Sequence, residues 1–405
     1  MHEDRSLQAL GASGLHSVRL GAMIPLPEGA TLALLPGCRP LGVNARGDTQ
    51  QVRAVDAHPV AALLPTGFVR LFAPAYDKEP GAEHMPLFGY AAVASLHGRM
   101  FVAARRLDPG GSWDPAIHNT PDLRALVEAR VAADPANRLV AHHAYCATEY
   151  GCYTAQNIFY GRDEMASAVS VACNASCVGC ISEQLDDITA PHDRISFTPT
   201  VEEIVGMAAP HMDSAPNAMV SFGQGCEGEP LLRARLIARA MTQVRQRTDR
   251  GQFHINTNGS NSKALQHLID AGLDSVRVSM FSARDAQHIA YYGPRNYGLT
   301  DMIDCLRIAR RQGLHTSVNL LTYPGFTDHP DEAEALATFL RQSEAQMVQV
   351  RTLNMDRELL HEKVGLPAEP GLGIQELMTY LADRVPGLAF SSHTPCVGRA
   401  HAYVS

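Results

Sequence analysis

The sequence lacks the long apolar runs and the excess of positive charge that two large classes of protein need. No stretch reaches the roughly 18 apolar residues of a membrane-spanning helix, and the opening MHEDRSLQAL is acidic where a secretory signal peptide carries positive charge. The formal net charge of −8 offers no large basic surface for a phosphate backbone. We therefore expect a cytoplasmic protein with neither a membrane nor a nucleic acid as its partner.

The polarity of a disordered chain and the cysteine pattern of a disulfide framework are missing as well. Hydrophobic residues make up 45% of the 405 residues and charged residues 19%, which is ordinary for a globular protein. This length predicts a large domain of about 200 residues with a smaller companion. An odd number of cysteines, nine, in a chain without a signal peptide favours reduced thiolates that bind metal over disulfides.

Residues 1 to about 110 have the pattern of short strands. Apolar and polar residues alternate in brief runs, and His97-Gly98-Arg99 joins YAAVASL to MFVAAR as a hairpin turn would. A single helix is expected over residues 121–133, where apolar residues recur at helical spacing. We predict a β-rich N-terminal domain over residues 1–135, followed by a linker over residues 136–165.

From about residue 166 strands and helices alternate. The strands are expected at residues 168–172, 218–222, 253–257, 275–281, 316–323 and 347–355, and the helices at 201–209, 231–247, 262–273, 299–314 and 331–343. Serial units of this kind predict an α/β fold with six parallel strands, a partial (β/α)6 TIM-like barrel over residues 166–360. An open doubly wound sheet would give the same string of elements. Residues 361–405 are assigned to a C-terminal extension.

Three cysteines follow the first expected strand within eight residues: Cys173, Cys177 and Cys180. A loop with this spacing can surround one metal centre, and three thiolates leave one iron of a cubane cluster without a protein ligand. A purely structural site normally fills all four positions. A zinc site completed by a distant residue, or three buried thiols, would also explain the spacing. The place of the loop at a strand's carboxyl end favours a reactive centre.

Polar residues also follow the next strands. The segment Gly223-Gln-Gly-Cys-Glu-Gly-Glu-Pro230 combines flexible glycines with two carboxylates, and Asn256-Thr-Asn-Gly259 ends the third strand with groups that hydrogen-bond sugars or carboxylates. In the fourth strand Arg277 and Ser279 alternate with apolar residues, so both point to one face. Taken singly, these segments also fit a glycine-rich turn, an Asn-Gly turn and an exposed arginine.

The CxxxCxxC, GEP and TNG-like motifs, in this order after successive strands, resemble the radical S-adenosylmethionine (radical SAM) superfamily over residues 165–356. The resemblance implies that Cys173, Cys177 and Cys180 hold a 4Fe–4S cluster that cleaves S-adenosylmethionine (SAM) reductively. The resulting 5′-deoxyadenosyl radical would abstract hydrogen from a peptide or small-molecule substrate. A reductant such as flavodoxin or ferredoxin would supply the electron. The alternative is a non-catalytic iron–sulfur or zinc module for electron transfer or docking.

The resemblance also implies roles for single residues. Glu229, rather than Glu227, is expected to bind the amino group of SAM. The other residues expected to bind the cofactor are Gly225, Gly228, Thr257, Asn258, Arg277, Ser279 and Asn319. Arg351 and Asn354 are candidates for holding substrate. The chain departs from the family at Gly179, where an aromatic residue that contacts adenine usually precedes the third cysteine.

The other cysteines carry two further predictions. Cys226, beside the expected cofactor glutamate, is predicted to be catalytic, returning a hydrogen atom to a substrate radical; a small buried hydrophobe is the alternative. Cys146, Cys152 and Cys396 are predicted to bind an auxiliary metal or iron–sulfur cluster, which His142 and His143 could complete. Cys305 is assigned to core packing.

Overall fold

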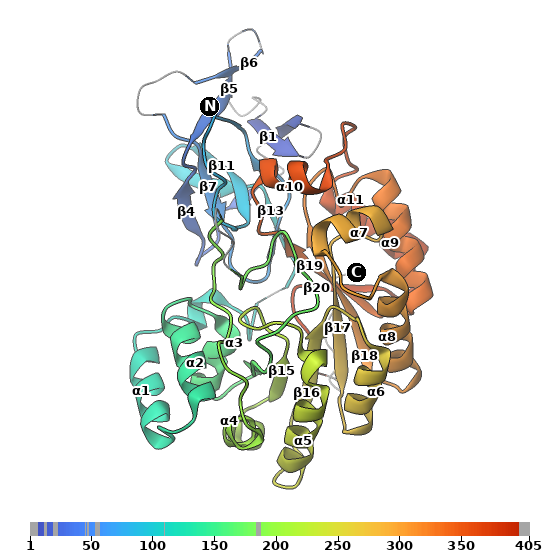
Figure 1. Cartoon of the computed structure of the whole chain (residues 1–405). Coiled ribbons are helices and arrows are strands. Elements are labelled where there is room, and N and C mark those ends of the chain that lie inside the picture. Colours follow the sequence, from blue (N-terminus) through green and yellow to red (C-terminus); the bar gives the residue numbers. More distant parts are fainter. Residues whose placement is uncertain are drawn as a thin grey trace.

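The computed structural model describes residues 7–11, 14–18, 23–44, 46, 48–52, 57–108, 110–183 and 188–396. Figure 1 shows a β-rich region above a curled parallel sheet, with a layer of helices along the outside of the sheet and a further group of helices at the lower left. Residues 397–405 of the expected C-terminal extension lie outside the described part.

The parallel sheet has seven strands whose spatial order is their order in the sequence. They are β14 (Glu164–Ala166), β15 (Met219–Phe222), β16 (Gln252–Thr257), β17 (Ser275–Met280), β18 (His315–Thr322), β19 (Met347–Thr352) and β20 (Ala389–Ser391). A doubly wound sheet reverses its strand order part-way, and this sheet does not. The prediction of an α/β fold with a partial TIM-like barrel and a β-rich N-terminal region is therefore confirmed.

The strand predicted at residues 168–172 is wrong. The first strand ends at Ala166, and only the Ser167 amide continues its pairing, donating to the Ser221 carbonyl. The next amides donate to side chains instead: Ala168 to His143, and Val169 and Ser170 to Glu227. Because side chains satisfy these amides, the chain leaves the sheet early. The seventh strand, β20, was missed because it has only three residues.

Helices form the outer layer of the sheet. In order along it they are α4 (Val201–Ser214), α5 (Ala234–Arg245), α6 (Ser262–Asp270), α8 (Leu299–Arg311), α9 (Pro330–Ser343) and α11 (Ile374–Arg384), and each contacts the next. The main core lies between these helices and the strands. Outside this layer are α7 (Asp285–Tyr292), α10 (Arg357–Val364) and the short 3-10 helices η2 (Pro115–Ile117) and η3 (Pro230–Arg233).

Residues 136–165, expected to be a linker, hold two helices and the first strand of the sheet. The helix expected at residues 121–133 is α1 (Leu123–Ala133), and α2 (Arg138–Thr148) and α3 (Tyr153–Tyr160) follow it. Asn137 begins α2 because its side-chain oxygen accepts from the amides of Leu139 and Val140. The segment packs into the fold, since α2 contacts α4, and α3 contacts β14.

The β-rich region is built from short, mainly antiparallel strands. They are β1 (Leu7–Gly11), β2 (Gly14–Val18), β3 (Ile24–Pro25), β4 (Thr31–Leu34), β5 (Cys38–Val43), β6 (Thr49–Gln51), β7 (Val60–Leu63), β8 (Phe68–Arg70), β9 (Ala73–Pro74), β10 (Tyr76–Lys78), β11 (Tyr90–Leu96), β12 (Arg99–Val102) and β13 (Ala104–Arg106). The expected hairpin is present: Leu96 pairs with Arg99, and His97 and Gly98 turn with φ of 49° and 76°.

Two buried charges attach the β-rich region to the barrel. The fully buried Arg70 donates from Nη1 to the Tyr90 carbonyl at 2.9 Å and from Nη2 to the Leu353 carbonyl at 3.4 Å. Asp356, which caps α10, accepts from the Met85 amide at 2.9 Å and pairs with Lys78 at 3.2 Å. The β-rich region is therefore held at the carboxyl end of β19. In the described part of the chain no helix is both long enough and apolar enough to cross a membrane.

Candidate active site

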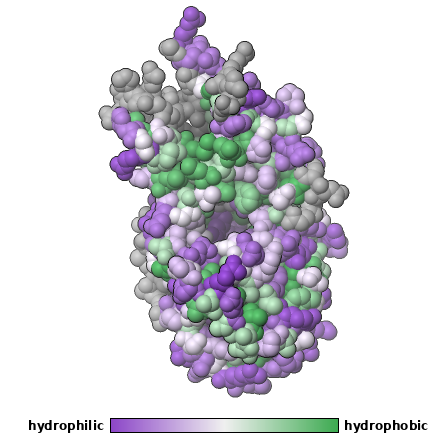
Figure 2. Space-filling view, turned by 90° about the vertical axis from the view of Figure 1, so that its left-hand side faces the viewer, coloured by the Kyte–Doolittle hydropathy of each residue, from purple (hydrophilic) through white to green (hydrophobic). Residues whose placement is uncertain are grey.

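A cavity of about 610 Å³ opens where the carboxyl ends of the parallel strands face the β-rich region. One wall consists of residues from the β-rich region, namely Leu63, Leu64, Pro65, Thr66, Phe68, Phe88 and Gly89. The other wall consists of strand ends and the loops that follow them. Figure 2 shows a hollow about midway down one face of the molecule, with hydrophilic residues in its depth and hydrophobic residues gathered above it.

The three cysteines of the predicted cluster loop line this cavity and are half-buried. The loop lies against α7, because the Ser176 and Val178 amides donate to the Tyr292 and Tyr291 carbonyls at 2.8 and 2.9 Å. Arg194 donates from Nη2 to the Cys180 sulfur at 3.3 Å. A cationic donor at sulfur stabilises the thiolate, which is the form that binds metal. Burial raises the pKa of Cys177 well above its ordinary value.

Glu227 holds the loop after β15 in place. Its carboxylate accepts from four backbone amides, those of Val169, Ser170, Gly223 and Gln224. Burial raises its pKa to about 8, although the four amides act in the opposite direction. Glu227 also lines the cavity, but the backbone amides of two loops occupy both of its oxygens, so its carboxylate has no acceptor site left for a ligand.

Glu229 has capacity left for a ligand. Its carboxylate accepts from the amides of Leu231 and Asn258 at 2.9 and 2.8 Å and from the Thr257 hydroxyl. A carboxylate has about four acceptor sites, so one remains on a residue that lines the cavity. Burial raises the pKa of Glu229 to about 7. The contrast with Glu227 supports the choice of Glu229 as the group that faces the cofactor.

Close approach of backbones explains the glycine at position 228. A Cβ on Gly228 would overlap the Ala172 carbonyl, which the Glu229 amide uses as its acceptor at 2.9 Å. Asn258 joins the next loop to the cysteine loop, since its side-chain nitrogen donates to the Asn174 side-chain oxygen at 2.7 Å. The loops after the first three strands are therefore fixed against one another.

The depth of the cavity is polar. Arg277, Ser279, Asn319 and Arg351 line it from β17, β18 and β19, whereas Val276, Val278 and Met280 are fully buried, as the alternation in β17 predicted. Arg277 donates from Nη1 to the side chains of Gln349 and Thr394. Burial lowers its pKa to about 10, so it remains charged at neutral pH. All eight residues expected to bind the cofactor and the three loop cysteines line this one cavity.

The family comparison agrees with this geometry. Residues 167–339 match the model described as the radical SAM superfamily. These residues form a radical SAM domain. The predicted resemblance to this superfamily is thereby confirmed over these residues, and the family implies a 4Fe–4S cluster and SAM as cofactors.

The solved structures that match this chain have low sequence identity to it and low TM-scores. They include SuiB of Streptococcus suis bound to its precursor peptide SuiA, with 12% identity, a TM-score of 0.40, and coverage of 62% of this chain and 53% of SuiB. For methylornithine synthase, PylB, the values are 13%, 0.39, 68% and 72%. For the radical SAM methyltransferase TsrM of Kitasatospora setae they are 15%, 0.37, 48% and 37%. The chain spans about half the length of SuiB. No curated protein matches it by sequence.

The residues at the site fit the cofactors that radical SAM domains use. Three thiols on one loop reach the cavity, and no other cysteine among the described residues lines it. Glu229 offers an acceptor there, and Gly228 leaves room for its loop to pass close to the cysteines. Three thiolates and a nearby carboxylate are the donor set that a cluster with one exchangeable iron and an aminoacyl ligand would need.

Tyr291 of α7 fills the place that an aromatic side chain at position 179 would take. A Cβ on Gly179 would lie 2.6 Å from the Tyr291 hydroxyl and 2.8 Å from the Met355 methyl. Tyr291 is buried, lines the cavity and stacks on Phe281 with ring centres 4.3 Å apart. No local sequence pattern indicated this contact, since Tyr291 is far from Gly179 along the chain.

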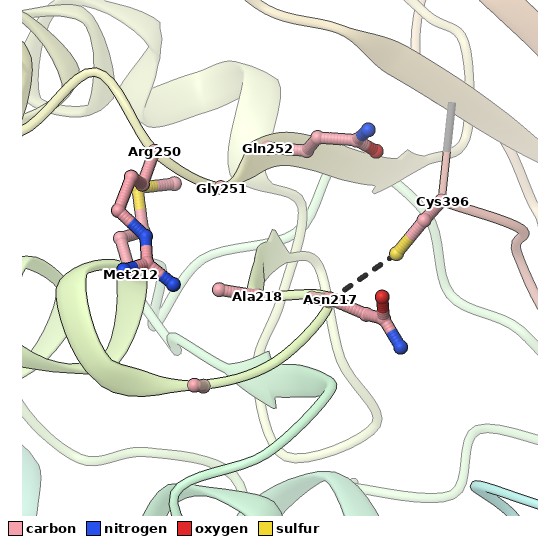
Figure 3. A pocket seen from close by; sticks show the side chains of 8 residues that line it. Met212, Asn217, Ala218, Arg250, Gly251, Gln252 and Cys396 are labelled. Atoms are coloured by element: carbon pink, nitrogen blue, oxygen red, sulfur yellow. Dashed lines mark hydrogen bonds between the residues drawn. The ribbon is translucent and has the colours of Figure 1, made fainter. Parts of the chain in front are cut away.

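The four remaining predicted cysteines lie outside the cavity, and their roles stay predictions. Cys226 is buried beside Cys146, His142 and His143. Cys152 shares a hydrogen bond with the Thr154 hydroxyl at 3.3 Å. Cys396 donates to the Asn217 carbonyl at 3.2 Å, in a small hollow before β15 and thus at the opposite end of the sheet (Figure 3). The described part of the chain therefore does not bring Cys146, Cys152 and Cys396 together as one ligand set.

Proposed function

We propose that this enzyme binds a 4Fe–4S cluster on Cys173, Cys177 and Cys180 and SAM in the same cavity, and abstracts hydrogen from a substrate held under the β-rich region. The observation that carries the proposal is that the three loop thiols and Glu229 line one cavity. When bound, the reduced cluster and SAM supply a 5′-deoxyadenosyl radical and methionine. We also propose that an external one-electron reductant, such as flavodoxin or ferredoxin, reduces the cluster.

The chain's own residues would orient the cofactor. Glu229 accepts from the amino group of SAM with the acceptor site that the protein leaves unused. Thr257 and Asn258 hold that carboxylate and line the cavity next to it. Ser279, Arg277 and Asn319 face the same space with hydroxyl, guanidinium and amide groups, which suit the ribose and the carboxylate of SAM. Because Gly225 and Gly228 have no side chain, the loop that carries Glu229 can pass close to the cysteine loop.

The β-rich region would exclude water from the reaction. An apolar wall opposite the strand ends is formed by Leu63, Leu64, Phe68 and Phe88. Such a wall keeps water away from the radical. Arg351 and Asn354, which also line the cavity, suit a carboxylate or amide on the substrate. A cavity of about 610 Å³ that also receives SAM leaves space for a small molecule or for one residue of a peptide.

Formation of 5′-deoxyadenosine tests the proposal. The protein is reconstituted anaerobically with iron and sulfide, then given dithionite and SAM, and the products are measured by liquid chromatography and mass spectrometry. We expect 5′-deoxyadenosine even without substrate. A protein with a full complement of cluster iron that forms none would contradict the proposal and favour the alternative, a non-catalytic module for electron transfer or docking.

A further inference from the structure

Four potential metal ligands lie together behind the cavity wall. His142, His143 and Cys146 come from α2, and Cys226 comes from the loop after β15. One ligand atom of each lies within 4.8 Å of those of the other three, and all but His142 are buried. None of the four lines the cavity described above. Two thiols and two imidazoles in one buried place are the donor types that zinc and divalent iron prefer.

The spacing within this group matches a metal site. His142 and Cys146 are one helical turn apart and therefore share a face of α2. The His142 Nε2 and the Cys146 sulfur are 3.7 Å apart. With zinc–sulfur and zinc–nitrogen bonds of about 2.3 and 2.0–2.1 Å, a tetrahedral ion separates these two ligand atoms by about 3.6 Å. An ion could bind between them with little movement of the helix.

His143 differs from the other three because one of its nitrogens is already engaged. Its Nε2 accepts from the Ala168 amide at 3.2 Å, which places the ring proton on Nδ1. Nδ1 is buried and has no hydrogen-bond partner of normal geometry among the described residues, although the Cys146 thiol lies beside it. A metal-bound thiolate at Cys146 would supply the acceptor that this N–H lacks.

We propose that Cys146, Cys226 and His142 bind one divalent transition-metal ion, zinc by the chemistry of the ligands, while His143 donates from Nδ1 to the Cys146 thiolate. The half-buried His142 leaves solvent a route to the fourth position, as in zinc sites with three protein ligands. The ion ties α2 to the loop that carries Glu227 and Glu229. Neither Cys152 nor Cys396 belongs to this ligand set.

Cobalt binding to the full-length chain tests the site apart from the cluster loop. Cys173, Cys177 and Cys180 are all replaced by alanine, so that the loop cannot bind metal, and the reduced protein is titrated anaerobically with Co²⁺. We expect one Co²⁺ per chain, with the visible bands of tetrahedral cobalt and a near-ultraviolet thiolate-to-cobalt band. Because the loop thiols are absent, this result does not depend on the proposed radical chemistry.

Further substitutions in that background identify the ligands. Cys146→Ser, Cys226→Ser or His142→Ala should each weaken Co²⁺ binding at least a hundredfold, and His143→Ala about ten- to a hundredfold through the lost hydrogen bond. Cys152→Ser and Cys305→Ser serve as matched controls and should leave the affinity unchanged. Binding that survives Cys226→Ser would overturn the proposal, as would a folded protein that binds no Co²⁺.

X-ray absorption spectroscopy of the chain with all its cysteines tests the same site even if the triple variant does not fold. The protein is purified without chelators and analysed for zinc. We expect close to one zinc per chain, with two sulfur ligands at about 2.3 Å and nitrogen at about 2.0 Å. A protein that contains cluster iron but no second metal, or that carries a disulfide between Cys146 and Cys226 when isolated anaerobically, would overturn the proposal.

Discussion

The two groups of cysteines in this protein differ in how they are assembled and in what they face. Cys173, Cys177 and Cys180 come from one short loop, are half-buried and line the cavity. Cys146 and Cys226 come from a helix and a distant loop, are buried, and meet two imidazoles rather than the cavity. Sulfur ligands that reach open space can share their metal with a cofactor, whereas sulfur ligands enclosed by protein fix one part of the fold to another.

Cys177→Ala should have the largest effect of the substitutions considered. With two thiolates left, the loop should lose its cluster, so cluster iron and 5′-deoxyadenosine formation should both fall to background. Iron and sulfide analysis and the product assay measure the two effects. Cys305→Ser, a buried thiol that donates to the Gly259 carbonyl, is the matched control and should keep both. A Cys177→Ala protein that still makes 5′-deoxyadenosine would refute the assignment of the loop.

Glu229→Gln should weaken SAM binding by about ten- to a hundredfold, because it removes a charged acceptor worth about 1.5–3 kcal/mol. Equilibrium dialysis with the reconstituted protein measures the affinity. Glu227→Gln is the matched variant. It should mainly lower the free energy of unfolding, since an amide group cannot accept from all four backbone amides. Equal losses of SAM affinity in the two variants would show that the two carboxylates do not have separate roles.

Gly179→Ala should destabilise the cysteine loop by about 1–3 kcal/mol, the usual cost of overpacking. The added methyl group would meet the Tyr291 hydroxyl, which a Cβ would approach to 2.6 Å. Tyr291→Phe removes that oxygen and should recover part of the loss. Denaturant unfolding of the two single variants and the double variant measures the interaction between the sites. Purely additive effects would argue against contact between the loop and α7.

Arg194→Met should have the smallest effect. Arg194 donates to the Cys180 sulfur at 3.3 Å, and loss of a cationic donor to sulfur makes the cluster harder to reduce. We expect cluster iron to be retained and the reduction potential to fall by tens of millivolts. A redox titration followed by electron paramagnetic resonance gives the potential. An unchanged potential would mean that Arg194 pairs with Glu183 rather than tuning the cluster.

The sequence was sufficient to predict those parts of the site whose residues lie close together along the chain. The cysteine loop, the GEP and TNG-like segments and the strand alternation all lie at the ends of elements that hydrophobic patterns reveal, so the cavity's polar wall could be predicted. The apolar wall could not, because Leu63 and Phe88 reach the cavity only once Arg70 and Asp356 attach the β-rich region. Cys226 is near Glu229 in the sequence, but no local pattern indicated that it lies outside the cavity and beside residues of α2.

Mössbauer spectroscopy of the protein reconstituted with 57Fe tests most directly whether three loop thiolates leave one iron of the cluster open to SAM. Spectra are recorded with and without SAM. We predict that one quarter of the cluster iron changes its isomer shift and quadrupole splitting when SAM is added, while the other three irons do not. A spectrum that SAM leaves unchanged, from a fully loaded cluster, would contradict the account.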